Sequence, residues 1–442
     1  KCIEDEIPFE LPDSWAWARL GNIGEIITGG TPSKSHHEYY GNAFPFFKPA
    51  DLDQGRKTII SSEYLSEKGK AYCRIIPKFS TAVCCIGSIG KCGYLNVEGT
   101  TNQQINSIIP NIDSLYVYYY CSSDCFSEQL LSLASATTIA IVNKSKLESV
   151  FIPVPPMVEQ KRIANTLDTA LELIETLEVE KSDILVAINN VKFKILDLAI
   201  RGKLVPQDPN DEPASVLLER IRAEKEELIK QGKIKRDKKE SIIFKGDDNS
   251  YYLRTDKLIE SLDDWRFDEL PYNWSLCCLG EICDYGNCIN VDSSSIAESA
   301  WILDLEDIEK DTGIVLKKIK KSERNAASTK HLFHKGQVLY SKLRPYLNKV
   351  VLADEDGYCT SEILPLDFSE IIVPEYARYF LMSPTFLRYA NKCSYGVKMP
   401  RLGTTDGKKA ILSLPPIEEQ KRIVIAIEKA ISSLSSITEN LS

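Results

Sequence analysis

The longest regular pattern of apolar positions in this chain of 442 residues lies near its middle. Apolar residues recur there at alternating steps of four and three, and only one polar residue interrupts them. The positions are Ile163, Leu167, Ala170, Ile174, Leu177, Lys181, Ile184, Ile188, Val191, Ile195 and Leu198. This heptad spacing predicts one long helix, about residues 156–200, with a continuous seam for a partner helix. At about 1.5 Å per residue the helix would span on the order of 65 Å.

A second seam begins near the end of the chain and continues through Ile423, Ile427, Ala430, Leu434, Ile437 and Leu441. Both seams follow similar starts, VPPMVEQKRI at 154–163 and LPPIEEQKRI at 414–423, and proline is tolerated in a first helical turn. We predict that the two helices pair as an antiparallel coiled coil. The residues expected to form the pairing are Ile163, Leu167, Ile174, Leu177, Ile188, Ile195, Ile423, Ile427, Leu434 and Ile437. The alternative is that each helix packs on its own globular domain.

The helix starts belong to a larger internal repeat. The segment ELPDSWAWARLGNIGEI at 10–26 matches ELPYNWSLCCLGEICDY at 269–285, so each half opens on Leu-Pro-x-x-Trp and closes on Pro-Pro-x-x-Glu-Gln-Lys-Arg. Inside these frames, short apolar runs alternate with Gly, Pro, Asn and Asp turns, which is typical of mixed α/β domains rich in strand. The interiors share few identities. Two versions of one recognition domain would show this pattern, and so would a duplication followed by neutral drift.

These boundaries divide the chain into four parts and predict an α+β protein with a pseudo-two-fold internal repeat. Residues 1–153 form a first domain, and residues 154–262 form a central helical region. That region holds the long helix, a second helix at about 213–231 and a basic linker that includes IKRDKKES. Residues 263–413 form a second domain similar to the first, and residues 414–442 form the C-terminal helix. The long helices separate the two domains.

Composition narrows the class of protein. Hydrophobic residues make up 43% and charged residues 26%, as in ordinary globular proteins. No run of about 18 apolar residues is present, so we expect no membrane span. The 13 cysteines lack zinc-ligand spacing, which predicts free thiols in a reducing cytoplasm. The net charge of −9 argues mildly against nucleic-acid binding, although an overall sum can hide a local basic surface.

Motifs that would indicate a reaction are missing. SIGKCGY at 88–94 resembles a phosphate loop only superficially, because Cys92 occupies the position of the Mg²⁺-binding Ser or Thr. Asp304, Glu306, Asp307 and Asp311 could form a metal loop, but an acidic turn on a solvated face is the simpler interpretation. We therefore predict no catalytic residue, no metal and no cofactor on this chain.

Basic side chains gather in the second domain, where they could neutralise phosphates and contact guanine edges. The candidate DNA-binding residues there are Lys317, Lys318, Lys320, Lys330, Lys342, Arg344, Tyr346, Lys398 and Arg401. Between Lys317 and Lys349 Glu323 is the only acid, and this bias within an acidic chain favours a nucleic-acid surface. The alternative is a solvated lysine-rich surface. In the first domain the cations, which include Arg56 and Lys57, are spread out. The candidates there are Lys34, Lys48, Lys91, Lys144 and the amides Asn102, Gln103 and Gln104, which could pair with adenine or simply cap turns.

The framed duplication, the repeated PPxxEQKRI and the stretch LAIRGKLVPQDPNDEPASVLLERIRAEKEELI at 198–229 together resemble the specificity subunit of type I restriction–modification enzymes. The resemblance covers essentially the whole chain. It implies two target-recognition domains that each read one half of a split sequence in double-stranded DNA, with the paired helices setting the spacer. It also implies two methyltransferase subunits, which use S-adenosylmethionine, and restriction subunits, which use ATP. The subunit itself has no catalysis.

Two alternatives remain beside this interpretation. One is a protein-interaction scaffold whose domains bind proteins, which the acidic net charge permits. The other is an enzyme with an unrecognised site, for which the sequence offers no repeated catalytic cluster. One departure from the family pattern is the second helix, which ends with the chain at Ser442. Two explanations stay open, the loss of part of that spacer and a variant locus.

Overall fold

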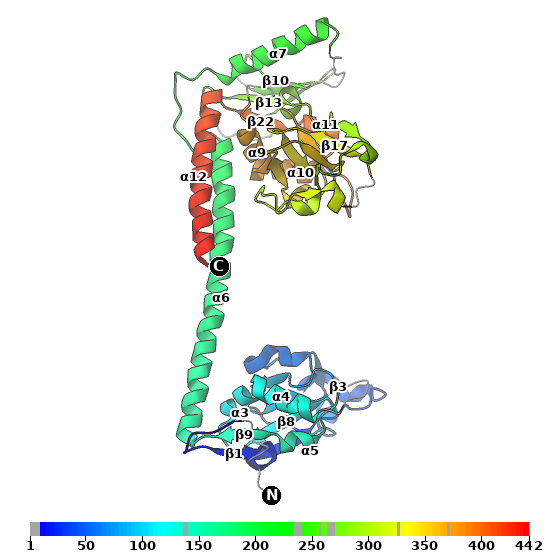
Figure 1. Ribbon diagram of the computed structural model, residues 1–442, viewed down its shortest axis with the longest axis vertical. Helices are drawn as coiled ribbons and strands as arrows, with labels where there is room; N and C mark the ends of the chain where they lie inside the picture. Colours follow the sequence, from blue (N-terminus) through cyan, green and yellow to red (C-terminus); the bar gives the residue numbers. More distant parts are fainter. Residues whose placement is uncertain are drawn as a thin grey trace. The chain divides into compact units, whose positions relative to one another are not determined.

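A computed structural model of the chain describes residues 9–135, 140–233, 241–248, 250–255, 258–262, 270–324, 328–368 and 372–441. The chain forms two compact units, Lys1–Val179 and Glu180–Ser442, and each unit has its own hydrophobic core (Figure 1). The boundary between the units falls inside the long helix α6, Met157–Ile200. No helix in the described residues is long and apolar enough to cross a membrane.

The first unit is built on three small sheets, with strand orders β2-β8-β5-β6, β4-β3-β7 and β1-β9. Its strands are β1 Ala16–Arg19, β2 Gly24–Thr28, β3 Tyr40–Phe47, β4 Glu63–Leu65, β5 Thr81–Cys84, β6 Cys92–Tyr94, β7 Thr100–Thr101, β8 Ile105–Pro110 and β9 Phe151–Val154. Its helices before α6 are α1 Leu20–Ile23, η1 His37–Tyr39, η2 Asp51–Lys57, α2 Glu67–Lys70, α3 Ser114–Cys121, α4 Asp124–Leu133 and α5 Lys144–Ser149.

Local sequence explains where the helices of this unit begin. Asp113, Ser123 and Asn143 precede α3, α4 and α5, and each side chain accepts a hydrogen bond from a backbone N–H of the first turn. Such caps satisfy donors that the helix leaves unpaired. The buried faces of α3 and α4 pack on the central strands through Val117 and Phe126, so the larger sheet and the helices share one core.

The second unit holds four sheets, with orders β14-β17-β20-β15-β16, β19-β18-β21, β13-β22 and β10-β11-β12. Its strands are β10 Ile242–Lys245, β11 Tyr251–Arg254, β12 Ile259–Ser261, β13 Ser275–Cys278, β14 Ile289–Val291, β15 Trp301–Leu303, β16 Ile319–Lys320, β17 Lys330–Phe333, β18 Val338–Ser341, β19 Val350–Leu352, β20 Gly357–Thr360, β21 Ile363–Leu366 and β22 Ile411–Leu414. Its helices are α7 Ala214–Lys230, α8 Leu279–Ile282, η4 Ser293–Ser295, η5 Leu305–Asp307, η6 Lys321–Glu323, η7 Pro345–Leu347, α9 Pro374–Met382, α10 Pro384–Cys393, α11 Thr404–Lys408 and α12 Ile417–Leu441.

Part of the region expected to be a linker is folded. The strands β10, β11 and β12 form an antiparallel sheet, and Ile243 and Leu262 pack with Leu276 and Cys278 of the second domain. The apolar residues of this short sheet therefore extend the core of the second unit. Most of the basic segment IKRDKKES, residues 234–240, lies outside the described residues.

The internal repeat is visible at the level of single hydrogen bonds. In the first unit the indole Nε1 of Trp15 donates to Glu159 Oε2 at 3.1 Å, which joins the Leu-Pro-x-x-Trp start to the first turn of α6. In the second unit Trp274 Nε1 donates to Glu419 Oε2 of α12 at 2.9 Å. The two ends of each frame thus meet through the same pair of residue types, which explains why both ends recur in the sequence.

The glutamine that follows each of these glutamates has the same role in both units. Its side chain is buried and accepts a hydrogen bond from a backbone N–H just before α3 in the first unit or α9 in the second. It also donates to the carbonyl of the proline two positions before its own helix. The bonds are Asp113 N to Gln160 Oε1 at 3.0 Å, Gln160 Nε2 to Pro155 O at 2.8 Å, Val373 N to Gln420 Oε1 at 2.9 Å and Gln420 Nε2 to Pro415 O at 3.0 Å. The repeated Glu-Gln pair therefore fastens each domain to its helix, and the predicted internal repeat of two mixed α+β domains is confirmed.

The helices α6 and α12 lie side by side over the last part of α6 and run in opposite directions (Figure 1). Leu196 and Ile200 of α6 share one hydrophobic cluster with Ile423 and Ile427 of α12. The same cluster includes Tyr376 of α9, so α12 packs on its own domain and on α6 at once. The predicted pairing of long helices is thus present, and it coexists with the packing that was its alternative.

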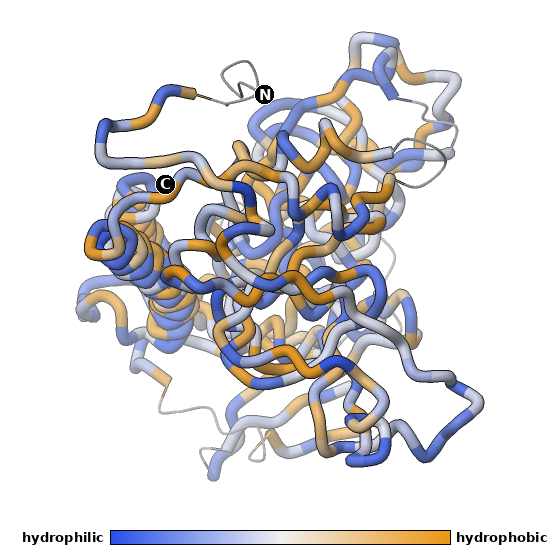
Figure 2. Tube along the Cα trace, turned by 90° about the horizontal axis from the view of Figure 1, so that it is seen from below, coloured by the Kyte–Doolittle hydropathy of each residue, from blue (hydrophilic) through white to orange (hydrophobic). Residues whose placement is uncertain are grey.

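The remaining seam positions differ in burial. Ile188 is buried, and Ile195 packs against the same cluster as Ile427. Leu167, Ile174 and Leu177 are 41%, 50% and 54% exposed. Figure 2 looks down the stacked helical turns near the C-terminus, and these turns carry both hydrophilic and hydrophobic positions.

Candidate nucleic-acid interface

Five of the candidate DNA-binding residues of the second domain come together in two adjoining loops. One loop, residues 342–349, follows β18, and the other, residues 394–403, connects α10 to α11. Arg344 N donates to Pro400 O at 2.7 Å and Leu402 N donates to Lys342 O at 3.0 Å, so the two loops are joined by backbone hydrogen bonds. We call these two segments loop cluster 2. It carries the candidates Lys342, Arg344, Tyr346, Lys398 and Arg401.

The backbone of the first of these loops is held in an uncommon conformation. Arg344 and Asn348 both have a φ of 49°, in the left-handed region that residues other than glycine seldom adopt. Pro345 starts the short helix η7 between them, and Asn348 Nδ2 donates to Met382 O at 3.1 Å. Backbone strain of this kind persists only where the surrounding structure maintains it, and it is found mostly at functional sites. The loop presents Tyr346 with 47% of its surface exposed.

Arg401 is paired inside loop cluster 2 rather than fully available. Its Nε and Nη2 donate to the two oxygens of Glu362 at 3.0 and 2.8 Å, in a forked geometry. The hydrogen bonds that Arg401 donates to Glu362 raise the pKa of its guanidinium, which is charged in any case. Lys342, Arg344 and Lys398 make no side-chain ion pair among the described residues, so they contribute most of the available positive charge here.

The rest of the basic run does not form one open surface. Lys318 Nζ bonds to Asp354 Oδ2 and Glu355 Oε1, both at 2.8 Å, and these bonds raise its pKa. Lys330 is buried and donates to Ser328 Oγ at 3.0 Å. Lys317 and Lys320 are exposed. The run has one acid in sequence, but the fold brings further acids against Lys318, so the available positive charge lies at loop cluster 2 and at Lys317 and Lys320.

The acidic turn considered as a metal loop is occupied by an arginine. Arg324 Nη1 lies 2.5 Å from Asp304 Oδ2, and Arg324 Nη2 lies 2.7 Å from the buried Asp307. Among the described residues no group of three or more His, Cys, Asp or Glu side chains could hold a metal ion.

In the first domain, the corresponding loops also converge. Cys85 N donates to Gln104 O at 2.7 Å and Val142 N donates to Cys85 O at 2.9 Å, so the loops at 85–91, 102–104 and 140–143 meet. Gly29 N donates to Ile105 O at 3.0 Å, which brings the loop at 29–36 to the same place. We call these segments loop cluster 1.

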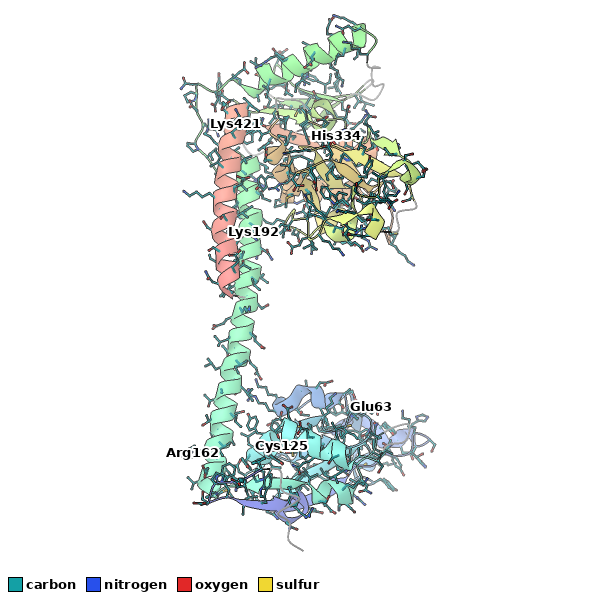
Figure 3. All side chains as sticks on the ribbon, viewed as in Figure 1. Glu63, Cys125, Arg162, Lys192, His334 and Lys421 are labelled. Carbon is teal, nitrogen blue, oxygen red and sulfur yellow. The ribbon has the colours of Figure 1, made fainter. Side chains whose placement is uncertain are left out.

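The amides and cations of the first domain divide into engaged and exposed groups. Asn102 is buried and exchanges two hydrogen bonds with Gln104, at 2.9 and 3.1 Å, as a turn-capping amide would. Gln103 is exposed and accepts a hydrogen bond from Thr31. Three of the lysines are ion-paired; the pairs are Lys48 with Glu63 at 2.5 Å, Lys91 with Asp53 at 2.7 Å and Lys144 with Glu148 at 3.6 Å. Figure 3 labels Glu63, the partner of Lys48. Lys34 is exposed and has no ion pair in the described part of the chain.

The two loop clusters occupy the same place in the repeat. In the first domain Ile141 forms backbone bridges to Ile86 and Ser135, and in the second Arg401 forms the equivalent bridges to Leu343 and Tyr395. The scaffold is therefore shared, while the side chains on it differ, CIGSIGK at 85–91 against KLRPYLNK at 342–349. Tyr395 belongs to this site, with 62% of its surface exposed. Sequence reasoning missed it because only the cations of the KMPRL segment were considered; an aromatic residue beside a glycine was the available signal.

Comparison with known proteins agrees with this duplicated arrangement. The family model described as "Type I restriction modification DNA specificity domain" matches the chain twice, over residues 12–190 and 271–442. The specificity subunit of the type I restriction enzyme EcoAI from Escherichia coli is 32% identical over 337 residues, which are 64% of this chain and 53% of that protein. The EcoDI specificity subunit from the same species is 23% identical over 98% of this chain and 84% of its own length. The chain spans about half the length of the first curated relatives it matches.

Solved structures share the fold. The HsdS subunit from Thermoanaerobacter tengcongensis superposes with a TM-score of 0.54 at 15% identity, over 99% of this chain and 94% of that one. A chain from structures of the complex assembly and conformational transition of a type I R-M system superposes with a TM-score of 0.60 at 15% identity, covering 98% and 94% of the two chains. These likenesses extend to the whole described architecture.

Proposed function

Since the chain belongs to the family of type I restriction modification DNA specificity domains, we propose that it is the DNA sequence-recognition subunit of a type I restriction–modification enzyme. Each domain would read one half of a bipartite target in double-stranded DNA. The observation that carries this proposal is the contrast within the repeat. The Trp–Glu and Gln bonds that fasten each domain to its helix are the same in both units, whereas the exposed loops differ.

The loop clusters supply the chemistry that reading DNA requires. Lysine and arginine side chains neutralise phosphates, and arginine can also donate two hydrogen bonds to the major-groove edge of guanine. Loop cluster 2 offers Lys342, Arg344 and Lys398 for this purpose, with Tyr346 able to contact sugar or base. Loop cluster 1 offers Lys34 and Gln103 and carries little net positive charge. We therefore propose that the second domain makes the stronger contribution to phosphate contacts.

The other candidate residues extend this interface only in part. Lys317 and Lys320 are exposed and can approach phosphates. Lys48, Lys91, Lys144, Lys318 and Arg401 would have to exchange an internal ion pair for a phosphate contact. Lys330 is buried at the start of β17 and bonds to Ser328, whereas Asn102 and Gln104 support the turn in which they lie.

Partners supply the catalysis in this proposal. Two methyltransferase subunits, which hold S-adenosylmethionine, would dock on the repeated helical parts, and restriction subunits would hold ATP. The paired helices would set the spacing between the two half-sites. This chain would contribute recognition alone and would work in the cytoplasm, where the chromosomal DNA lies.

A protein-interaction scaffold is the second candidate, and one observation favours it. Val397 is fully exposed and Met399 is 46% exposed, on the same loop as Tyr395. Exposed apolar and aromatic side chains on one loop are typical of protein contacts as well as of DNA contacts.

Co-expression of the chain with the neighbouring methyltransferase, followed by sequencing of methylated adenines in host DNA, tests the proposal. We expect a split motif, two short half-sites around a fixed gap. Methylation that requires only one half-site would show that one domain does not read DNA. A stable complex that methylates no specific sequence would contradict the proposal and favour the scaffold.

A further inference from the structure

Two cations of the first domain are used neither in its core nor in loop cluster 1. Arg56 and Lys57 end the short helix η2, and both reach α6. Arg56 Nη1 lies 2.7 Å from Asp168 Oδ1 and 3.3 Å from Glu172 Oε1, and its Nη2 lies 3.4 Å from Glu175 Oε2. One arginine thus bonds to three carboxylates of the same helix.

Two neighbours reinforce this contact. Lys57 Nζ lies 2.5 Å from Glu175 Oε2, and the hydroxyl of Tyr119 on α3 donates to Asp168 Oδ1 at 2.7 Å. The carboxylates recur at steps of four and three along α6, which places them on one face of the helix. Arg56 lies near the end of η2, yet its side chain is only 10% exposed. The site therefore encloses the guanidinium.

The loop that carries Arg56 is shaped for this position. Gly55 has a φ of 57°, a conformation that other residues adopt only with strain, and it breaks η2 just before Arg56. Asn96 Nδ2 then donates to the Arg56 carbonyl at 2.8 Å. The backbone is therefore fixed on both sides of the side chain that reaches α6.

Little else holds the first domain to α6 beyond the first turns. Ala164 is buried in the domain core and Ile163 packs against it. From Asn165 to Val179, every side chain of α6 is exposed except Asp168. Figure 1 shows α6 continuing away from the domain after β9. The ion pairs therefore extend the contact from Ala164 to Glu175, about three helical turns.

The second domain contacts its helix α12 beyond the first turn through apolar packing. Ile423, Val424 and Ile427 of α12 are buried in its core, and Ile431 packs against them. Glu428, at the position that corresponds to Asp168, is exposed and forms no ion pair in the described part of the chain. Beyond the first helical turns, the first domain therefore contacts its helix through ion pairs and the second domain through apolar side chains.

We propose that Arg56 is a positioning residue, which with Lys57 and Tyr119 latches the first domain to the α6 carboxylates and fixes the angle at which the helix carries that domain. Building on the proposed function, this latch restricts the spacing between half-sites that the subunit accepts. Arg56 contacts no DNA in this role. Replacing it relaxes the spacing without changing the half-site sequences.

Hydrogen exchange tests the latch in the full chain, independently of DNA. In Arg56→Gln we expect faster exchange of the α6 amides between residues 165 and 179, because the helix there loses its tie to the domain. Lys68→Gln, which removes an exposed cation of the same domain, is the matched control and should leave this segment unchanged. Arg56→Lys should fall between, since lysine keeps the charge but cannot form the fork. Arg56→Glu should speed exchange further than Arg56→Gln, because a carboxylate there would face Asp168, Glu172 and Glu175.

Salt provides a second readout within the same experiment. At 1 M salt the Debye length is only about 3 Å, so the wild-type segment 165–179 should exchange faster while α12 residues 423–431 stay protected. Exchange in α6 that is unchanged by both Arg56→Gln and salt would overturn the latch.

Spacing is measured on targets read from methylated host DNA. The wild-type subunit should direct methylation only to targets whose half-sites have the native gap. Arg56→Gln should also allow methylation of targets whose gap is one base pair longer or shorter. Unchanged spacing selectivity, despite faster exchange, would overturn the positioning role and leave the proposed function intact. If wild type recognises no split sequence, the proposed function fails, and the exchange measurement decides the latch by itself.

Discussion

At the scale of single residues, this chain is organised by a few buried polar groups that join its repeated sequence elements. Trp274 and Glu419 lie 145 positions apart, and both are almost completely buried. A hydrogen bond to a buried carboxylate contributes roughly 1.5–3 kcal/mol, and an unpaired partner costs as much. The equivalent bond between Trp15 and Glu159 is more exposed, so the two copies differ in energy although they match in sequence.

This difference predicts unequal effects of one substitution. Trp274→Phe should lower the unfolding free energy of the second unit by about 2–4 kcal/mol, because Glu419 Oε2 loses its hydrogen-bond donor and a small cavity opens. Trp15→Phe should cost about 1 kcal/mol, because water can reach Glu159. Urea unfolding followed separately in each unit by hydrogen exchange measures both; equal losses would contradict this account.

Glu281 gives a pH dependence at the same scale. Burial raises the pKa of this carboxyl above its ordinary value of 4.5, despite its bonds to Cys278 N and Arg222. A raised pKa in the folded state means that the folded state binds the proton more tightly. The stability that Glu281 confers is thus fully present below pH 4.5 and is lost as pH rises through the raised value.

We therefore expect wild type to gain stability over Glu281→Gln as pH falls from 7 toward 5. Urea denaturation at several pH values between these limits is the measurement, with the exposed Glu298→Gln as control. A difference between wild type and Glu281→Gln that stays constant over this range would show that burial does not dominate.

At the scale of elements, α12 does two things at once, because its apolar positions face both α6 and the second domain. The heptad pattern predicted an apolar face on α12, but it does not determine how many elements pack against that face. Ile427 touches the common core and is fully buried, whereas Ile437, on the same seam, is 48% exposed. The contribution of α12 to stability therefore comes mainly from its first half.

Matched alanine substitutions test this division. Ile427→Ala should destabilise the second unit by about 2–5 kcal/mol, the usual cost of truncating a buried aliphatic side chain. Ile437→Ala should cost about 0.5 kcal/mol or less, as expected for an exposed position. Thermal or urea unfolding of the full chain compares them, and similar costs would place the second half of α12 in a buried interface.

At the scale of the whole molecule, duplication separates what must stay the same from what can vary. Both domains close on their helices through the same Trp, Glu and Gln bonds, so identical partners could dock on either copy. Loop clusters 1 and 2 lie on equivalent backbone bridges but present different side chains. Under the proposed function, a change in one cluster should alter one half of the target alone.

Arg344→Gln tests this independence. It should change or relax the half-site read by the second domain and leave the other half-site and the gap unchanged, because the loop clusters share no residue. Lys230→Gln, an exposed cation of α7, serves as control for the lost charge. Sequencing of methylated adenines gives the result, and a change in both halves would refute independent reading.

The frame of this protein was predictable because its signals are local and periodic. A step of four and three along residues 163–198, prolines at a helix start and a Trp that recurs before Leu-Gly need no knowledge of distant contacts. They indicated two domains, long helices and their pairing. The repeated Glu-Gln pair pointed to the helix starts, although its bonds to Trp15 and Trp274 and to the starts of α3 and α9 were not foreseen.

Charge and burial at the site depended on contacts between residues far apart in the chain. Lys318 looks free in sequence until Asp354 and Glu355 fold against it, and Arg56 looks like a scattered surface cation until α6 brings three carboxylates to it. Lys342 and Lys398 lie more than fifty positions apart and meet only because two loops share backbone bonds. Periodicity reports the face of an element, whereas the pairing of charges depends on how the elements pack, and that is why the helices could be predicted from the sequence and the interface could not.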